Sequence, residues 1–207
     1  RKARVATFFA AVEKAGGVPV RDQTTVAFVV QAVVPGPLSV AGSFNSWSKT
    51  ADVMTKVAGT DLYYLIKKLG GGRQEYKYVD GKGAWHKDPN NRHVAWDGIP
   101  GQGLGKFNSV IPPWGAAQTK GRLEWLRVKS PQLANTRDVF VYLPAAYDLD
   151  TCKRYPVLLV NDGNESIARS QLDQVAAATF AAKKASPAVL VFVALASLLG
   201  VEAILGA

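Results

Sequence analysis

The chain has 207 residues, of which 48% are hydrophobic and 20% are charged, and its formal net charge is +9. This apolar fraction is sufficient for a buried core, and the length allows one large domain or two small ones. The positive charges are scattered and form no run longer than Lys67–Lys68, so we do not expect a nucleic-acid-binding protein. The single cysteine, Cys152, excludes an intrachain disulfide and leaves the compartment open between the cytoplasm and the periplasm or exterior.

Residues 1–20 predict a short amphipathic helix. Its apolar residues Val5, Phe8, Phe9 and Val12 form one stripe, and Gly16 ends it. We expect this helix to pack on the domain that follows.

Residues 21–114 predict a β-sandwich. Short stretches rich in β-branched and aromatic residues alternate with Gly- and Pro-containing turns, at a spacing of roughly 8–12 residues. The expected strands are Thr24–Val34, Leu38–Ala41, Asp61–Leu69, Gln74–Asp80 and Lys106–Ile111.

Residues 115–121 read as a linker, and residues 122–207 predict an incomplete α/β domain. The pattern of strand, loop, helix and strand is a βαβ unit with at least one parallel pair. The apolar run Ala188–Ala207 is long enough to raise the question of a membrane helix. Its first half is β-branched and follows Pro187, which favours a buried strand, so we expect no membrane span. The expected elements are strands Leu123–Lys129, Asp138–Leu143, Tyr155–Val160 and Ala188–Ala194, and helix Gln171–Lys184.

Two tryptophans in the first region are candidate ligand-binding residues. Trp47 follows the loop-forming residues Gly-Ser-Phe-Asn-Ser, and Trp85 follows a Gly-rich hairpin. Indole rings offer flat surfaces to the C–H faces of a sugar, while Lys and Asn supply hydrogen bonds to its hydroxyl groups. The alternative for each tryptophan is core packing. We predict that Phe44 and Tyr76 lie in the core and that Asp88-Pro89-Asn90 is a turn.

The motifs GSFNSW, EYKYVDG and W-x-x-DP-x-N occur in this order between about Thr24 and Ile111. Together they resemble the family 48 carbohydrate-binding modules, the glycogen- and starch-binding modules of branching enzymes and of the AMP-activated protein kinase β subunit. The resemblance implies an immunoglobulin-like sandwich of the E-set type that binds α-glucan. It also implies the roles of the site residues: Trp47 and Trp85 would stack on glucose and Lys77 would bond to the sugar, with the site completed by Leu104 and Asn108.

Two features depart from that family. Lys106 stands where the kinase module has a small hydroxyl residue, and Lys82-Gly83-Ala84 lengthens the VDG-to-Trp segment by about two residues. Many domains of this shape accompany enzymes without binding sugar, so fold alone does not establish binding.

The segments TRDVFVYLPAAYD and KRYPVLLVNDGNE, within Arg122–Ala196, resemble the esterase D group of α/β-hydrolases, especially enterochelin-esterase-like proteins. The resemblance implies a serine nucleophile on a G-x-S-x-G elbow, an acid and a histidine. It makes Gly163 and Asn164 candidate oxyanion-hole positions. The alternative is a plain turn at the end of a strand.

The sequence contains no G-x-S-x-G motif, and its histidines, His86 and His93, precede the linker. We therefore predict no catalytic residue, metal site or cofactor in this chain. Because Ala188–Ala194 is only the fourth expected strand and the elbow follows the fifth, we expect a fragment or a partial view of a longer hydrolase. Such an incomplete sheet would leave one edge and a large apolar face uncovered.

Three hypotheses remain. The first is an α-glucan-binding module attached to a serine esterase that acts on a small ester. The second is an esterase whose sandwich shapes the active site or a homodimer without binding sugar. The third is a non-enzymatic glycogen-binding scaffold.

Overall fold

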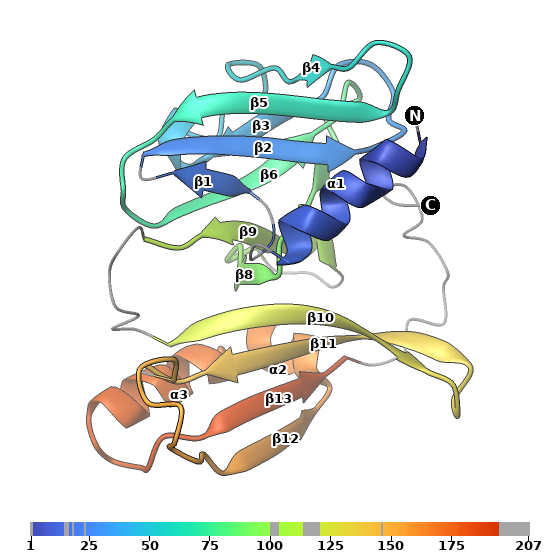
Figure 1. Cartoon of the computed structure of the whole chain (residues 1–207). Helices are drawn as coiled ribbons and strands as arrows, with labels where there is room; N and C mark the ends of the chain where they lie inside the picture. The colour runs from blue at the N-terminus through green and yellow to red at the C-terminus, as the bar shows by residue number, and fades with distance from the viewer. Residues whose placement is uncertain are drawn as a thin grey trace. The chain divides into compact units, whose positions relative to one another are not determined.

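The computed structural model describes residues 2–14, 17, 19–22, 24–99, 104–113, 121–145 and 147–194. These residues form mainly β-strands with few helices (Figure 1). By their contacts they divide into two compact units. The first contains the described residues up to Arg92 and those from Asn108 to Pro113, and the second contains the remainder. Apart from Gly121, the predicted linker lies outside the described residues.

The first unit consists of helix α1 and two antiparallel sheets. One sheet has the strand order β1-β2-β5-β4. In the other, β6 lies between β3 and β9 and also pairs with the short strand β7. The elements are α1 (Lys2–Lys14), β1 (Val20–Asp22), β2 (Thr25–Gln31), β3 (Ser39–Gly42), the short helix η1 (Ser43–Asn45), β4 (Thr55–Lys56), β5 (Leu62–Lys68), β6 (Gln74–Val79), β7 (Trp85–His86) and β9 (Phe107–Ile111).

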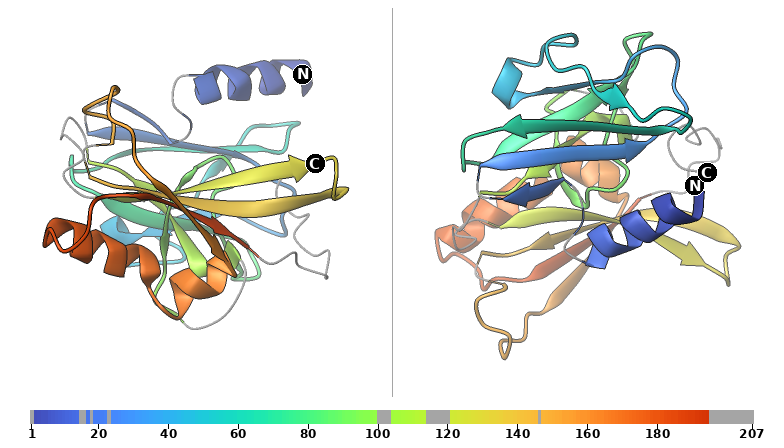
Figure 2. Two further views of the ribbon diagram at one scale, coloured as in Figure 1. Left: turned by 90° about the horizontal axis from the view of Figure 1, so that it is seen from below. Right: turned by 45° about the horizontal axis from the view of Figure 1, so that its top comes forward.

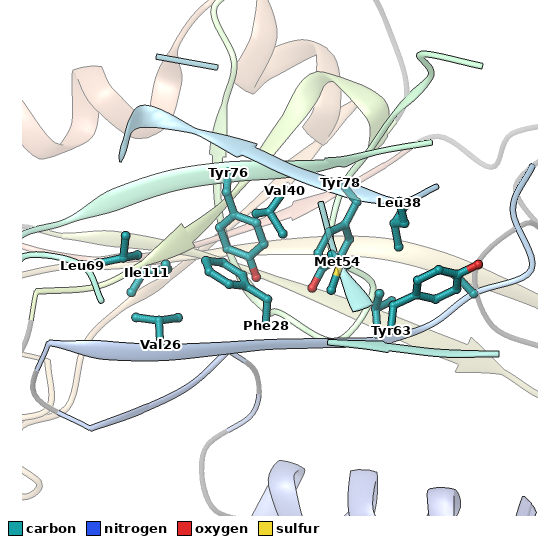
Figure 3. Packing of buried hydrophobic residues seen from close by; sticks show 12 residues of the cluster. Val26, Phe28, Leu38, Val40, Met54, Tyr63, Leu69, Tyr76, Tyr78 and Ile111 are labelled. Atoms are coloured by element: carbon teal, nitrogen blue, oxygen red, sulfur yellow. The ribbon is translucent and has the colours of Figure 1, made fainter. Parts of the chain in front are cut away.

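Apolar side chains from both sheets of this unit form its core. Strand β2 contributes Val26 and Phe28, and β6 contributes Tyr76 and Tyr78 from the opposite sheet (Figure 3). Phe28 packs edge-on against Tyr76, with ring centroids 4.9 Å apart. Successive side chains of a strand point to opposite faces, so the alternation of Val26, Phe28 and Val30 directs all three inward.

The predicted strands of the first unit are found, each with ends within three residues of those expected. Tyr76 is fully buried and Phe44 packs against the core, so both core predictions are confirmed. Strands β1, β4 and β7 were not predicted, because two or three residues are too few to display a periodic pattern.

The second unit is a sheet with the strand order β12-β13-β11-β10-β8, with α2 and α3 on one face of it (Figure 2). Strands β12 and β13 are parallel, and the other neighbours are antiparallel. The predicted βαβ unit is therefore present. The elements are β8 (His93–Trp96), the short helix η2 (Leu104–Lys106), β10 (Arg122–Ser130), β11 (Asn135–Leu143), β12 (Val157–Asn161), α2 (Gly163–Ala168), α3 (Leu172–Ala181) and β13 (Val189–Val193).

Strand β8 differs from the sequence-based expectation. Residues 93–96 were expected in the sandwich, but His93 pairs with Glu124 and Val94 with Leu123, both on β10. Val94 is buried with Phe140 and Phe192 in the core of the second unit. The sequence of a four-residue strand does not indicate which strand it pairs with, because that pairing depends on contacts with residues far away in the chain.

Edge strand β12 exposes much of its apolar surface. Val157, Leu158 and Leu159 are 67%, 52% and 63% exposed. The expected uncovered edge is therefore present within the described part of the chain. None of the described helices is long and apolar enough to span a membrane, and Val189–Val193, in the apolar run, forms β13.

Candidate functional site

The loop that carries Trp47 is held by the side chain of Asn45. Its Oδ1 accepts a hydrogen bond from the Gly42 amide at 2.9 Å, and its Nδ2 donates to Val40 O at 2.9 Å and to Asp52 Oδ2 at 2.7 Å. A Cβ at Gly42 would lie 2.4 Å from Glu75 O, so this position has no room for a side chain. Gly42 and Asn45 of the GSFNSW motif therefore have structural roles in forming the loop.

The backbone of this loop is strained where it reaches Trp47. Ser46 and Trp47 have φ values of 54° and 60°, in the left-handed region that residues other than glycine seldom adopt. The Trp47 amide donates to Gly42 O at 2.9 Å, while Phe44 anchors the loop with its ring 5.8 Å from that of Phe28. Two consecutive residues in this region cost about 1 kcal/mol or more each. These anchors offset this cost, and the Trp47 side chain is half-buried.

Asp80 organises the turn that leads to Trp85. Its Oδ1 accepts hydrogen bonds from the amides of Lys82 at 2.9 Å and Ala84 at 3.0 Å, and its Oδ2 lies 3.0 Å from His86 Nε2. Burial by itself would raise the pKa of Asp80, but the hydrogen bonds from His86, Ala84 and Lys82 outweigh burial and lower it. The extra residues of the VDG-to-Trp segment are thus accommodated in a turn closed by one carboxylate.

The register of β6 places three of the predicted site residues on one face. Trp85 pairs with Val79, and paired residues of an antiparallel ladder point to the same side. Lys77 lies two residues before Val79 and shares its face, opposite to the core. Asn108 also lies on this face, because its Nδ2 donates to Glu75 Oε2 at 2.7 Å.

Trp47 and Trp85 approach each other at this face. Their ring centroids are 6.2 Å apart with an interplanar angle of 56°, and both side chains are half-buried. Neither belongs to the core cluster of the first unit. Two aromatic rings 38 residues apart in the sequence, one on a loop and one on β7, thus form one partly exposed surface, which we call the Trp47–Trp85 face.

The polar site residues are less accessible. Lys77 and Asn108 are each 5% exposed, so both are buried in this conformation. Leu104 begins the short helix η2, and its side chain lies outside the described residues. The structure thus brings Trp47 and Trp85 into contact range, while Lys77 and Asn108 share the face of Trp85 without an open surface.

Sequence reasoning missed Lys49. Its Nζ lies 5.3 Å from the centroid of the Trp85 ring, at cation–π distance. Its place two residues after Trp47 is the only signal in the sequence, and that spacing alone does not predict a contact with Trp85.

A buried polar network lies on the core side of β6. Asp88, fully buried, accepts hydrogen bonds at Oδ2 from Tyr76 at 2.6 Å and from Tyr78 at 3.0 Å. Its backbone amide donates to Ser109 Oγ at 2.8 Å. Burial raises the pKa of Asp88, and burial followed by the charge of Asp88 raises both tyrosine pKa values well above normal. The predicted turn at Asp88-Pro89-Asn90 is thus also an anchor that joins the turn to β6 and β9.

The second candidate site follows β12. Asp162 has a φ of 53°, and α2 begins at Gly163. A Cβ at Gly163 would lie 2.6 Å from the Phe192 carbonyl carbon, so glycine permits the close approach of α2 to β13. Amides in the first turn of a helix have no partner within the helix, and those of Gly163 and Asn164 are in this position. Asn164 Oδ1 is buried and has no hydrogen-bond partner within the described part of the chain.

The described residues contain no group of three His, Cys, Asp or Glu side chains suited to a metal ion. His93 lies in the second unit, with Nδ1 4.0 Å from Glu124 Oε1, where it forms part of strand β8. Residues 162–165 were predicted as a loop or a plain turn at the end of a strand, but α2 begins at Gly163, so most of this segment is helical.

Comparison with known proteins finds only weak similarities. No protein-family model and no curated protein matches the chain. Among solved structures, it is similar to the enterobactin esterase FES from Shigella flexneri, with 16% identity, a TM-score of 0.41, and coverage of 87% of this chain and 55% of that one. The ferric enterobactin esterase of Salmonella typhimurium has 14% identity, a TM-score of 0.40 and coverage of 88% and 56%.

A ferulic acid esterase has 22% identity and a TM-score of 0.34, over 36% of this chain and 30% of that chain. The chain thus spans about half the length of the enterobactin esterases that it matches. These identities and TM-scores are low, so they assign the chain to no family, and none of the likenesses supports the predicted carbohydrate-binding module.

Proposed function

We propose that the first unit is an α-glucan-binding module with an E-set-type sandwich, attached to the first strands of a serine-esterase domain. The observation that supports it best is the Trp47–Trp85 face, where two half-buried indole rings lie 6.2 Å apart. A sugar ring has apolar C–H faces, and rigid indole rings bind such faces with little loss of side-chain entropy. The strained loop backbone at Trp47 agrees with a ring held in place for a ligand.

The angle between the rings favours a curved chain of sugars. At 56° the indoles are far from coplanar, so they match successive glucose units that turn relative to one another, as they do in an α-linked glucan. Lys77 and Asn108, which the resemblance assigns to sugar hydroxyls, are buried. In this proposal most of the affinity comes from Trp47 and Trp85, and the polar residues become ligands only when the face rearranges.

The proposed esterase activity is that of the full-length gene product and not of these 207 residues alone. Gly163 and Asn164 would supply amides to an oxyanion at the start of α2. The 207 residues contain no G-x-S-x-G motif, so the serine and its histidine would come from residues outside this sequence. Activity of the full-length gene product on a p-nitrophenyl ester tests this part separately.

One alternative has a specific observation in its favour. The burial of Lys77 and Asn108 agrees with a sandwich that shapes an esterase active site or a dimer without binding sugar. A non-enzymatic glycogen-binding scaffold would require sugar binding by the chain and no esterase activity in the full-length protein.

Affinity electrophoresis in gels that contain glycogen or amylose tests sugar binding. We expect the parent chain to be retarded, and we expect Trp47→Ala and Trp85→Ala each to reduce affinity about tenfold or more, the cost typical of truncating an aromatic anchor. Tyr64→Ala is the matched control, because Tyr64 is 39% exposed on β5 in the other sheet. A parent chain that migrates equally with and without glucan would refute sugar binding.

A further inference from the structure

A lysine already occupies the neighbourhood of the Trp85 ring. Lys49 Nζ lies 5.3 Å from the ring centroid, and the position of a Cβ on Gly83 would be 3.8 Å from it. Lys49 is exposed, and its ammonium group lies close to Gly83, in the hairpin before Trp85. A glucose unit that stacks on this part of the ring must displace the ammonium group.

Within the described residues Lys49 makes no ion pair, and the nearby acidic side chains of both loops are engaged. Asp52 bonds to Lys67 at 2.7 Å, and Asp80 lies 3.0 Å from His86. Residues 1–114 carry 15 Lys and Arg against 8 Asp and Glu, so the net charge of this part of the sequence also favours an anion.

We propose that Lys49 makes the Trp47–Trp85 face selective for α-glucans that carry phosphate monoesters. This inference rests on the proposed glucan binding by the same face. On a neutral glucan, the loss of the cation–π contact opposes stacking on Trp85. On a phosphorylated glucan, the released ammonium group binds the phosphate oxygens, so the same displacement gains a charge-assisted contact.

The test compares one polymer in two charge states. Phosphorylated amylopectin and the same amylopectin after phosphatase treatment are each used in affinity gels with the parent chain, Lys49→Met and Lys68→Met. Lys68 is an exposed lysine on β5 in the other sheet, so its variant has the same net charge as Lys49→Met. Methionine retains the unbranched side chain, and the exposed positions should leave the thermal unfolding midpoint unchanged.

We expect the parent chain to bind the phosphorylated polymer about two- to fivefold more tightly, as an exposed ion pair allows. Lys49→Met should lose this preference and bind the dephosphorylated polymer about two- to fivefold more tightly than the parent, the strength of an exposed cation–π contact. Lys68→Met should behave like the parent. Equal binding of both polymers by the parent, or a preference that survives in Lys49→Met or disappears equally in Lys68→Met, overturns the selectivity while leaving glucan binding intact. Binding to neither polymer overturns the proposed function, and the selectivity with it.

Discussion

Replacing Asn45 should destabilise the loop that presents Trp47. Asn45→Ala removes three hydrogen bonds, to the Gly42 amide, to Val40 O and to Asp52 Oδ2. At about 1 kcal/mol each, this loss predicts a decrease of about 2–3 kcal/mol in the free energy of unfolding. The strained backbone at Trp47 loses its main support, so glucan retardation should fall together with stability.

Asn45→Asp distinguishes the hydrogen bonds from simple loss of side-chain volume. Aspartate can still accept from the Gly42 amide, but its second oxygen would face Asp52 Oδ2, which now lies 2.7 Å from the Asn45 Nδ2 atom. Two carboxylates about 4 Å apart near a protein surface repel each other by about 4 kcal/mol. Lys67, at 2.7 Å from Asp52, relieves part of this repulsion. We therefore expect Asn45→Asp to be less stable than Asn45→Ala at pH 7.

Urea unfolding followed by far-UV circular dichroism measures the stability of both variants, and hydrogen exchange of residues 40–52 measures the loop itself. The difference between the two variants should narrow as the pH is lowered, because protonation of one carboxylate of the new pair removes the repulsion. Asn90→Ala, an exposed asparagine in another turn, is the control and should change stability by no more than about 0.5 kcal/mol. The reasoning is wrong if Asn45→Ala matches the parent, or if Asn45→Asp exceeds Asn45→Ala in stability at pH 7.

Two further predictions concern the other turns. The pKa of Asp80 is lowered in the folded chain, so its stabilising contribution is present above the unfolded-state pKa and is lost as the pH falls through the folded-state pKa. Thermal unfolding between pH 7 and pH 2 should therefore show that the parent loses more stability on acidification than Asp80→Asn does, and equal losses would contradict this role. Gly163→Ala should destabilise the second unit by about 1–3 kcal/mol, because the new methyl group would lie 2.6 Å from the Phe192 backbone. Ala181→Gly, at the end of α3, provides a comparison without crowding, and an unchanged urea midpoint for Gly163→Ala would count against the close approach.

Local patterns were sufficient for most of the fold. Strand β2 was predictable because Val26, Phe28 and Val30 repeat with the period of a strand and all face the core. The βαβ arrangement of β12, α3 and β13 followed from two short apolar runs on either side of a helical pattern. The partner of β8 and the presence of α2 could not be predicted, because short elements depend on contacts with residues distant in the sequence.

The candidate site, like the fold, was predictable from the sequence only in part. The motifs predict loop positions for both Trp47 and Trp85. The structure has Trp47 on a loop and Trp85 at the start of β7, with both side chains half-buried. The motifs also assign Lys77 to a bond with the sugar, but alternation along β6 says nothing about what covers the face on which Lys77 lies, and Lys77 is buried.

By itself, the sequence determined the positions of the main strands, the glycine-containing turns and the loop position of Trp47. These features depend on backbone conformations and periodic patterns that extend over a few residues. Only the tertiary structure decided that Lys49 lies over Trp85, that Lys77 and Asn108 are buried, and that β8 pairs with β10. Each of these depends on the packing of segments far apart in the chain, where burial and electrostatics are set by neighbours that no local pattern specifies.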